Sequence, residues 1–156
     1  MIVFLKYGML PYKGGAMALS KELQTGKSGE HLVCFDLIQQ GYNAFLADQG
    51  LPYDVIVDTG KQMLRIQVKT VSKKNAGNGY AFSLRSGKKS NRLISIESID
   101  YMAFVFLDKR IVQYIPSPFI AVKDGFFKQS VVFYETTKDS KGNQRKYILG
   151  GFNSLQ

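Results

Sequence analysis

The segment Tyr101–Leu107 is a nearly continuous run of apolar side chains, and it constrains the fold more than any other part of the sequence. A short apolar run without alternation is typical of a β-strand that is covered on both faces. Such a strand needs other elements packed above and below it, and 156 residues suffice for one domain that supplies them. We therefore expect a single α/β domain with a substantial core, because 45% of the residues are hydrophobic.

The other predicted elements surround this central run. The segment Ser20–Gln40 is predicted to be a helix that ends at Gly41, where a left-handed cap is easily formed. The segment Met63–Thr70 alternates between apolar and polar side chains, as a half-buried strand does. Further strands are predicted at Asn43–Ala47, Asp54–Val57, Tyr80–Arg85, Ile111–Ile115, Ser130–Thr136 and Arg145–Leu149, the last two as an extra C-terminal β-hairpin with a basic tip.

The chain carries 21 Lys and Arg residues against 12 Asp and Glu residues, and its formal charge of +9 is unevenly distributed. Residues 59–95 contain nine bases and no acid: Lys61, Arg65, Lys69, Lys73, Lys74, Arg85, Lys88, Lys89 and Arg92. A second basic cluster is offset only by Asp139 and consists of Lys138, Lys141, Arg145 and Lys146. Long basic stretches attract polyanions, and the strand pattern here predicts one coherent face. We therefore expect a nucleic acid as partner, although a merely soluble basic surface is the alternative.

The single cysteine and single histidine exclude several classes of site. One cysteine cannot form a disulfide framework or a multi-cysteine zinc or iron–sulfur site, and one histidine cannot form a two-histidine or HNH-type centre. The couple Cys34–His31 is conceivable, since the two residues lie three apart in the predicted helix. A buried cysteine near a histidine is far more often structural than catalytic.

Membrane spans and secretory signals are sequence features that bear on the location of a protein in the cell. No segment reaches the roughly 18 apolar residues of a membrane span, so we expect no membrane partner. The first residues lack the basic and long apolar regions of a secretory signal, which predicts a cytoplasmic, nucleoid-associated protein. Met17 is a plausible alternative start, so we interpret residues 1–16 as an N-terminal extension and residues 17–156 as the single domain.

Four polar side chains are expected to meet on an otherwise apolar core: Glu30, Asp54, Gln67 and Lys69. Glu30 lies on the apolar side of the predicted helix, where a carboxylate needs a cationic partner. Asp54 opens a strand, and pairing of that strand with Met63–Lys69 would bring it near Gln67 and Lys69. These last two residues are two apart and therefore project to the same side of the sheet.

This set of groups is suited to the hydrolysis of phosphodiesters. Mg²⁺ prefers hard oxygen ligands and keeps several waters. A bound metal polarises the phosphate and lowers the pKa of a bound water, and a neighbouring lysine can steer or deprotonate that water. We therefore predict a Mg²⁺ site with Glu30, Asp54 and Gln67 as ligands and Lys69 beside them.

The order of these residues resembles the PD-(D/E)xK nuclease family, whose signature is a helix Glu, a strand-start Asp and (D/E)xK on the next strand. Glu30, Pro52-Tyr53-Asp54 and Gln67-Val68-Lys69 occupy these positions. Two features depart from the pattern: the proline stands two residues before the Asp, and Gln67 replaces the usual acid. The resemblance implies a restriction-endonuclease-like core, with a mixed central sheet flanked by helices.

Within this family, the stretch from Leu19 to Lys69 is similar to the group I intron-encoded homing endonucleases of cyanobacterial transfer-RNA genes. That resemblance implies a Mg²⁺-dependent endonuclease acting in intron homing, which cuts double-stranded DNA at a long pseudo-palindromic site. It also implies a homo-oligomer, with a tetramer favoured and a dimer possible. The residues expected to contact DNA are Lys27, Arg65, Lys73, Lys74, Arg85, Lys88, Lys89, Arg92, Lys138, Lys141, Arg145 and Lys146.

Several alternatives stay open at this stage. A Holliday-junction resolvase or a small restriction endonuclease shares the same core, and the neutral Gln67 is compatible with a catalytically decayed DNA-binding module. Glu30 could simply pair with Lys27, three residues before it on the helix. A domain of this size is not expected to cover all of the apolar area of Phe126–Tyr134, so part of it could form an oligomer interface.

Overall fold

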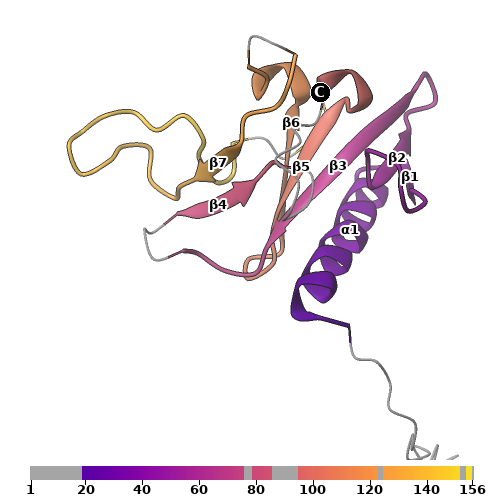
Figure 1. Ribbon diagram of the computed structural model, residues 1–156, viewed down its shortest axis with the longest axis horizontal. Helices are drawn as coiled ribbons and strands as arrows, with labels where there is room; N and C mark the ends of the chain where they lie inside the picture. The colour runs from indigo at the N-terminus through magenta and orange to yellow at the C-terminus, as the bar shows by residue number, and fades with distance from the viewer. Residues whose placement is uncertain (1–18, 76–78, 86–94, 123–124, 152–153, 156) are drawn as a thin grey trace, which may run out of the picture.

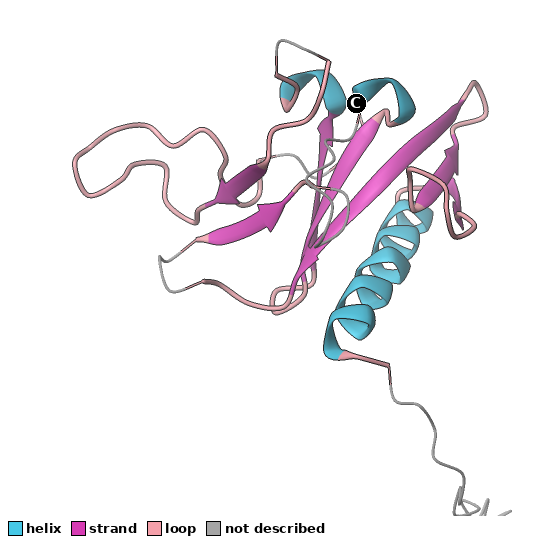
Figure 2. Cartoon of the chain, in the orientation of Figure 1, coloured by secondary structure: helices cyan, strands magenta, loops and turns pink. Residues whose placement is uncertain are grey.

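A computed structural model describes residues 19–75, 79–85, 95–122, 125–151 and 154–155. One long helix lies along one face of a twisted sheet, and a smaller sheet lies on the other side (Figures 1 and 2). The N-terminal extension expected at residues 1–16 lies outside the described residues. Within the described ranges, none of the helices is both long and apolar enough to cross a membrane.

The helix α1 (Lys21–Gln39) matches the predicted helix closely. The Ser20 hydroxyl caps its start by accepting a hydrogen bond from the Leu23 N–H. The helix is followed by Gly41 with φ of 90°, and this left-handed conformation is the one that a glycine adopts easily. The Tyr42 N–H then donates to the Leu37 carbonyl, which satisfies one of the last free acceptors of the helix.

The main sheet has five strands in the order β1-β2-β3-β5-β6. Their bounds are β1 (Asn43–Leu46), β2 (Val55–Asp58), β3 (Met63–Val71), β5 (Tyr101–Phe106) and β6 (Ile111–Pro116). Strands β3 and β5 are parallel and the other neighbours are antiparallel, so the sheet is mixed, as predicted. Two 3-10 helices, η1 (Ile96–Ser98) and η2 (Ser117–Phe119), flank the β5–β6 pair.

The two faces of the main sheet bury different kinds of side chain. The face covered by α1 is mainly aliphatic, and its core includes Val33, Leu37, Val55, Val57, Leu64, Ile66, Val68, Ala103 and Val105. The opposite face is rich in aromatic residues and includes Tyr80, Phe82, Met102, Phe104, Phe106, Phe127 and Phe133. Alternate residues of β5 therefore enter both cores, which confirms that its apolar run is a strand covered on both faces.

A second sheet of two strands, β4 (Tyr80–Ser83) and β7 (Ser130–Phe133), covers the aromatic face. The Phe82 ring meets those of Phe104, Phe106 and Phe133 at centroid distances of 5.0, 5.2 and 5.7 Å, all edge to face. Aromatic pairs of this geometry add about 0.5–1.5 kcal/mol each to the stability from buried area. The small sheet is thus fixed to the main one by ring packing.

The C-terminal region differs from the predicted hairpin in its pairing. Strand β7 pairs with β4, because this arrangement places Val131 and Phe133 in the aromatic core. The segment 145–149 forms no strand, and single bridges join Lys138 to Gln144 and Tyr134 to Ile148. After β7 the chain forms a long loop that extends away from both sheets (Figure 1) and then returns, so that Tyr147 and Leu149 pack against the aromatic core.

Three of the large apolar side chains of Phe126–Tyr134 are buried within the chain. Phe127, Val131 and Phe133 are buried, while Phe126 is 38% exposed. These three buried side chains are therefore part of the core of the chain rather than of a free apolar surface. Large apolar side chains are exposed elsewhere, on α1 and β1: Phe35, Ile38, Phe45 and Leu46.

Candidate active site

The carboxylate of Asp54 is held where β2 begins. The antiparallel register pairs Val55 with Ile66, so Asp54 falls opposite Gln67. The backbone N–H of Asp54 donates to the Ile66 carbonyl at 2.9 Å. Its Oδ2 atom accepts hydrogen bonds from the Val68 N–H at 2.8 Å and from Gln67 Nε2. The expected proximity of Asp54 and Gln67 is therefore present in the structure.

Strand β3 continues beyond the start of β2, and α1 approaches it there. Strand β2 pairs with β3 only as far as Ile66, whereas β5 pairs with β3 up to Val71. Gly29 is buried against Thr70 at this end, and a Cβ atom on Gly29 would lie 1.9 Å from Thr70 Oγ1. A glycine is needed for this close approach, which places the next residue, Glu30, beside the end of β3.

Glu30 forms an ion pair with Lys27, with a distance of 2.7 Å between Oε2 and Nζ. The Glu30 side chain is only 16% exposed, whereas that of Lys27 is 45% exposed. The structure therefore shows the pairing of Glu30 with Lys27 along the helix, which the sequence left open as an alternative. Hydrogen bonding and charge attraction from Glu30 raise the pKa of Lys27, which keeps this cation charged.

Lys69 is half-buried and makes a long contact of 3.5 Å from Nζ to the Arg85 carbonyl. Burial lowers the pKa of Lys69, and the charge of Asp54 partly opposes this change. Burial also raises the pKa of Asp54, with Glu30 adding repulsion and the Val68 N–H acting in the other direction. The charged forms of both groups are therefore disfavoured, as is common at catalytic centres.

A groove of about 510 Å³ runs between the first half of α1 and the end of β3. Glu30 and Lys69 both line it, and Asp54 and Gln67 are not part of its wall. Its remaining charged lining residues are Lys21, Glu22, Lys73 and Lys74. The groove is therefore more basic than acidic, and it leads from Lys69 along the segment that follows β3.

The oxygen atoms near Lys69 fit a hard cation better than a soft one. Among the described residues, no group of three or more His, Cys, Asp and Glu side chains is placed to hold a metal ion. Glu30 and Asp54 are the two carboxylates of the cluster, and the amide of Gln67 completes it. Two carboxylates and one amide suit Mg²⁺, which takes few protein ligands and keeps several waters.

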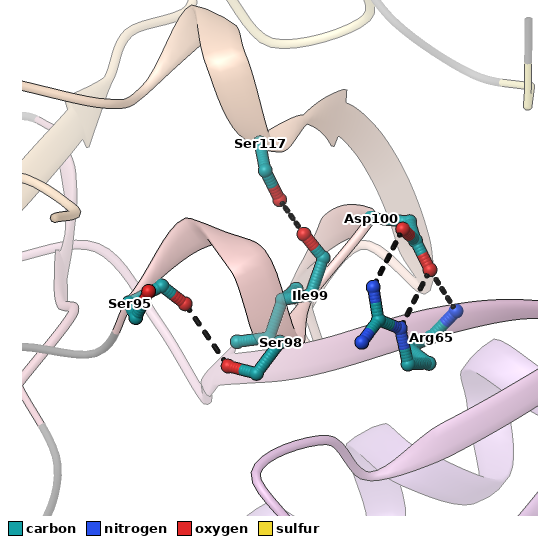
Figure 3. A network of polar contacts seen from close by, with 6 residues as sticks. All are labelled: Arg65, Ser95, Ser98, Ile99, Asp100 and Ser117. Carbon is teal, nitrogen blue, oxygen red and sulfur yellow. Dashed lines mark hydrogen bonds and ion pairs between the residues drawn. The ribbon is translucent and has the colours of Figure 1, made fainter. Parts of the chain in front are cut away.

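Arg65 lies on the same face of β3 as Gln67, but its side chain is engaged with Asp100 (Figure 3). Arg65 donates to Asp100 from its backbone N–H at 2.7 Å, from Nε at 3.0 Å and from Nη2 at 3.1 Å. Nearby, the Ser117 hydroxyl donates to the Ile99 carbonyl at 2.6 Å. This network joins the starts of β3 and β5 to η2.

The other predicted DNA-contacting residues that the structure describes beyond α1 lie after β3, after β4 and in the C-terminal loop. Lys74 pairs with Glu135, and the Arg85 guanidinium donates to Gln129. The Arg145 guanidinium lies 3.9 Å from the centre of the Tyr134 ring. Lys73, Lys138, Lys141 and Lys146 are exposed, and Lys88, Lys89 and Arg92 lie outside the described residues.

The Cys34–His31 couple gains no support. Burial and the nearby charge of Glu30 raise the pKa of the Cys34 thiol, which keeps it protonated and weakly nucleophilic. His31 is exposed on α1. Gly29 is the positioning residue that sequence reasoning missed, although a glycine inside a helix signals a packing requirement.

One long helix packed on a mixed five-stranded sheet is the arrangement of a restriction-endonuclease-like fold. The sequence model of the PD-(D/E)XK endonuclease family matches residues 20–147, a range that contains α1 and the seven strands that the structure describes. The chain therefore belongs to the PD-(D/E)XK endonuclease family. A comparison with curated protein sequences finds no match.

Two solved structures are similar to this chain to different degrees. The bacterial homing endonuclease I-Ssp6803I is 17% identical, with a TM-score of 0.60, and the alignment covers 81% of this chain and 83% of that one. The Holliday junction resolvase Hjc of Archaeoglobus fulgidus is 16% identical, with a TM-score of 0.45 and coverage of 68% and 82%. The similarity to the homing endonuclease extends over most of both chains.

Proposed function

We propose that this chain is a Mg²⁺-dependent endonuclease that hydrolyses phosphodiester bonds in both strands of duplex DNA. One observation carries the proposal: Asp54, Gln67 and Lys69 lie together where β3 leaves β2. Glu30 is positioned from α1 at the same end of β3, close enough for its charge to act on Asp54. The end of β3 and the neighbouring helix thus bring two carboxylates, an amide and an ammonium together beside a basic groove.

The residues have distinct proposed roles. Glu30 and Asp54 would hold Mg²⁺, with Gln67 supplying a neutral oxygen. When bound, the metal polarises the scissile phosphate and lowers the pKa of a coordinated water. Lys69 would offset the charge that develops on the phosphate, and its lowered pKa makes it a better proton acceptor near neutral pH than an ordinary lysine.

The proposed path of the DNA follows the groove away from Lys69. Lys21 and Lys73 line this path, and the exposed bases of the C-terminal loop would contact phosphates farther along the duplex. Each neutralised phosphate contributes to the salt dependence of binding, so replacement of Lys73 or Lys138 should reduce the slope of log affinity against log salt by about one unit. A slope that both replacements leave unchanged would remove these residues from the binding surface.

A homing-type activity at a long pseudo-palindromic site is the specific form that we propose. The similarity in fold to a bacterial homing endonuclease supports it, as does the basic surface. Cutting both strands of a two-fold site favours a symmetric oligomer, which we propose to be a tetramer, with a dimer as the alternative. Sedimentation of the purified chain with and without a two-fold duplex would measure this state, and a monomer under both conditions would contradict it.

Cleavage assays with matched aspartate variants test the nuclease proposal. In Mg²⁺, the full chain should cut a duplex that contains its site, and EDTA should stop the reaction. The variant Asp54→Asn should lose cleavage and keep DNA binding, whereas Asp48→Asn, the same change in the exposed loop before β2, should keep both. Cleavage that persists in EDTA or in Asp54→Asn would contradict the site, and a strong preference for four-way junctions would favour a junction resolvase.

A further inference from the structure

The amide of Gln67 has a defined orientation in the structure. Its Nε2 atom lies between two acceptors, Asp54 Oδ2 and the Val68 carbonyl, the latter at 3.4 Å. A carbonyl oxygen and an ionised carboxylate cannot donate, so beside ionised Asp54 the NH₂ end of the amide occupies this place. The amide oxygen of Gln67 is therefore turned away from the carboxylate with which it would share a metal ion.

Both carboxylates of the site are held by donors of the chain itself. Glu30 accepts from Lys27, and Asp54 accepts from Gln67 and from the Val68 N–H. These bonds compensate two negative charges that would otherwise repel each other without a metal between them. A glutamate at position 67, the usual residue of the family pattern, has no proton to donate when ionised and would add a third negative charge.

We infer that Gln67 is a positioning residue with two states. Without metal, its NH₂ group holds Asp54 in place, and with metal, the amide rotates so that its oxygen turns toward the cation. The inference rests on the proposed function in its second state only. The inference explains why a glutamine stands at position 67 in place of the usual acid. With a glutamine, the site can form before the metal binds, but it binds the metal more weakly than it would with a glutamate.

Thermal unfolding of the full chain, rather than cleavage, is the appropriate measurement. The variant Gln67→Glu should lower Tm in EDTA near pH 8 by about 3–6 °C, because a donor to Asp54 is replaced by a like charge. The variant Gln67→Met should also lower Tm in EDTA, but less, since it removes the donor without adding charge. The control Gln49→Glu makes the same chemical change in an exposed loop and should leave Tm unchanged.

Titration with Mg²⁺ distinguishes the two states. Because a ligand that binds the folded state raises Tm, Mg²⁺ should raise the Tm of Gln67→Glu more than that of the unchanged protein, with an apparent affinity about tenfold tighter. Mg²⁺ should raise the Tm of Gln67→Met less than that of the unchanged protein. A purely structural role of Gln67 would shift every Tm equally with and without Mg²⁺.

Specific outcomes would overturn the inference. An equal Tm for Gln67→Glu and the unchanged protein in EDTA would show that Gln67 does not hold Asp54. A destabilised Gln67→Glu that gains no more from Mg²⁺ than the unchanged protein would overturn the rotation. A chain that shows the expected Tm pattern and cuts no DNA would contradict the proposed function and leave the inference standing.

Discussion

Strand β3 carries two polar clusters on one face, and their electrostatics are opposite. At its first half, Arg65 and Asp100 satisfy each other with several hydrogen bonds, which raise the pKa of Arg65 and lower that of Asp100. At its second half, burial raises the pKa of Asp54 and lowers that of Lys69. The charged forms are thus favoured in the first cluster and disfavoured in the second.

This difference separates a structural ion pair from a candidate catalytic centre. The Arg65–Asp100 pair joins two parallel strands, and its ionised state stabilises the fold. The second cluster costs folding free energy, because buried groups are kept close to one another without full compensation. Groups that lower the stability of the folded state tend to lie at functional sites. The cluster at the end of β3 is therefore the one to test for catalysis.

The largest expected difference concerns the two cations of β3. Lys69→Met should reduce cleavage by about 10²–10⁴-fold, the usual effect of losing an acid–base group, while the free energy of unfolding stays equal or rises. Arg65→Met should instead lower the free energy of unfolding, and its cleavage, measured where the variant is folded, should fall far less. Single-turnover cleavage and chemical denaturation of both variants give these values. Equal effects on cleavage would abolish the distinction between the clusters.

A smaller effect is expected at the contact between α1 and the second cluster. Gly29→Ala should lower the free energy of unfolding by about 1–3 kcal/mol, because the new Cβ overlaps Thr70 and forces α1 away from β3. The same shift would move Glu30 and reduce cleavage. Gly26→Ala is the control, since its Cβ meets no atom within 4 Å and alanine favours a helix by roughly 1 kcal/mol. Equal stability of the two variants would contradict the close approach.

The local part of this architecture could be predicted from the sequence, and the long-range part could not. The alternation in β3 and the short connection to β2 indicated that Asp54 would meet Gln67, because a hairpin register follows from nearby residues. The pairing of β4 with β7 joins segments about fifty residues apart, and the stability of that pairing comes from ring packing that no local pattern reveals. The same holds for Arg65 and Asp100, which meet only because β3 and β5 are parallel.

The smallest expected effects concern the pH dependence of the free energy of unfolding. The contributions of Asp100 and Asp54 to this dependence should have opposite signs. The folded pKa of Asp100 lies below its ordinary value of 3.8, so its ionised form stabilises the fold above that pH, and this contribution is lost as pH falls through the folded pKa. The folded pKa of Asp54 lies above 3.8, so its ionisation costs stability as pH rises from 3.8 through the folded pKa.

Asp100→Asn should therefore lose on the order of 1 kcal/mol of stability at neutral pH, and the loss should shrink in acid. Asp54→Asn should gain stability relative to the unchanged protein at neutral pH, and this gain should disappear once the pH is below 3.8. Urea denaturation of the three proteins at about pH 7 and about pH 3 compares these differences directly. If Asp54→Asn were destabilised at neutral pH as much as Asp100→Asn, both clusters would be structural, and the end of β3 would lose its electrostatic distinction as a catalytic centre.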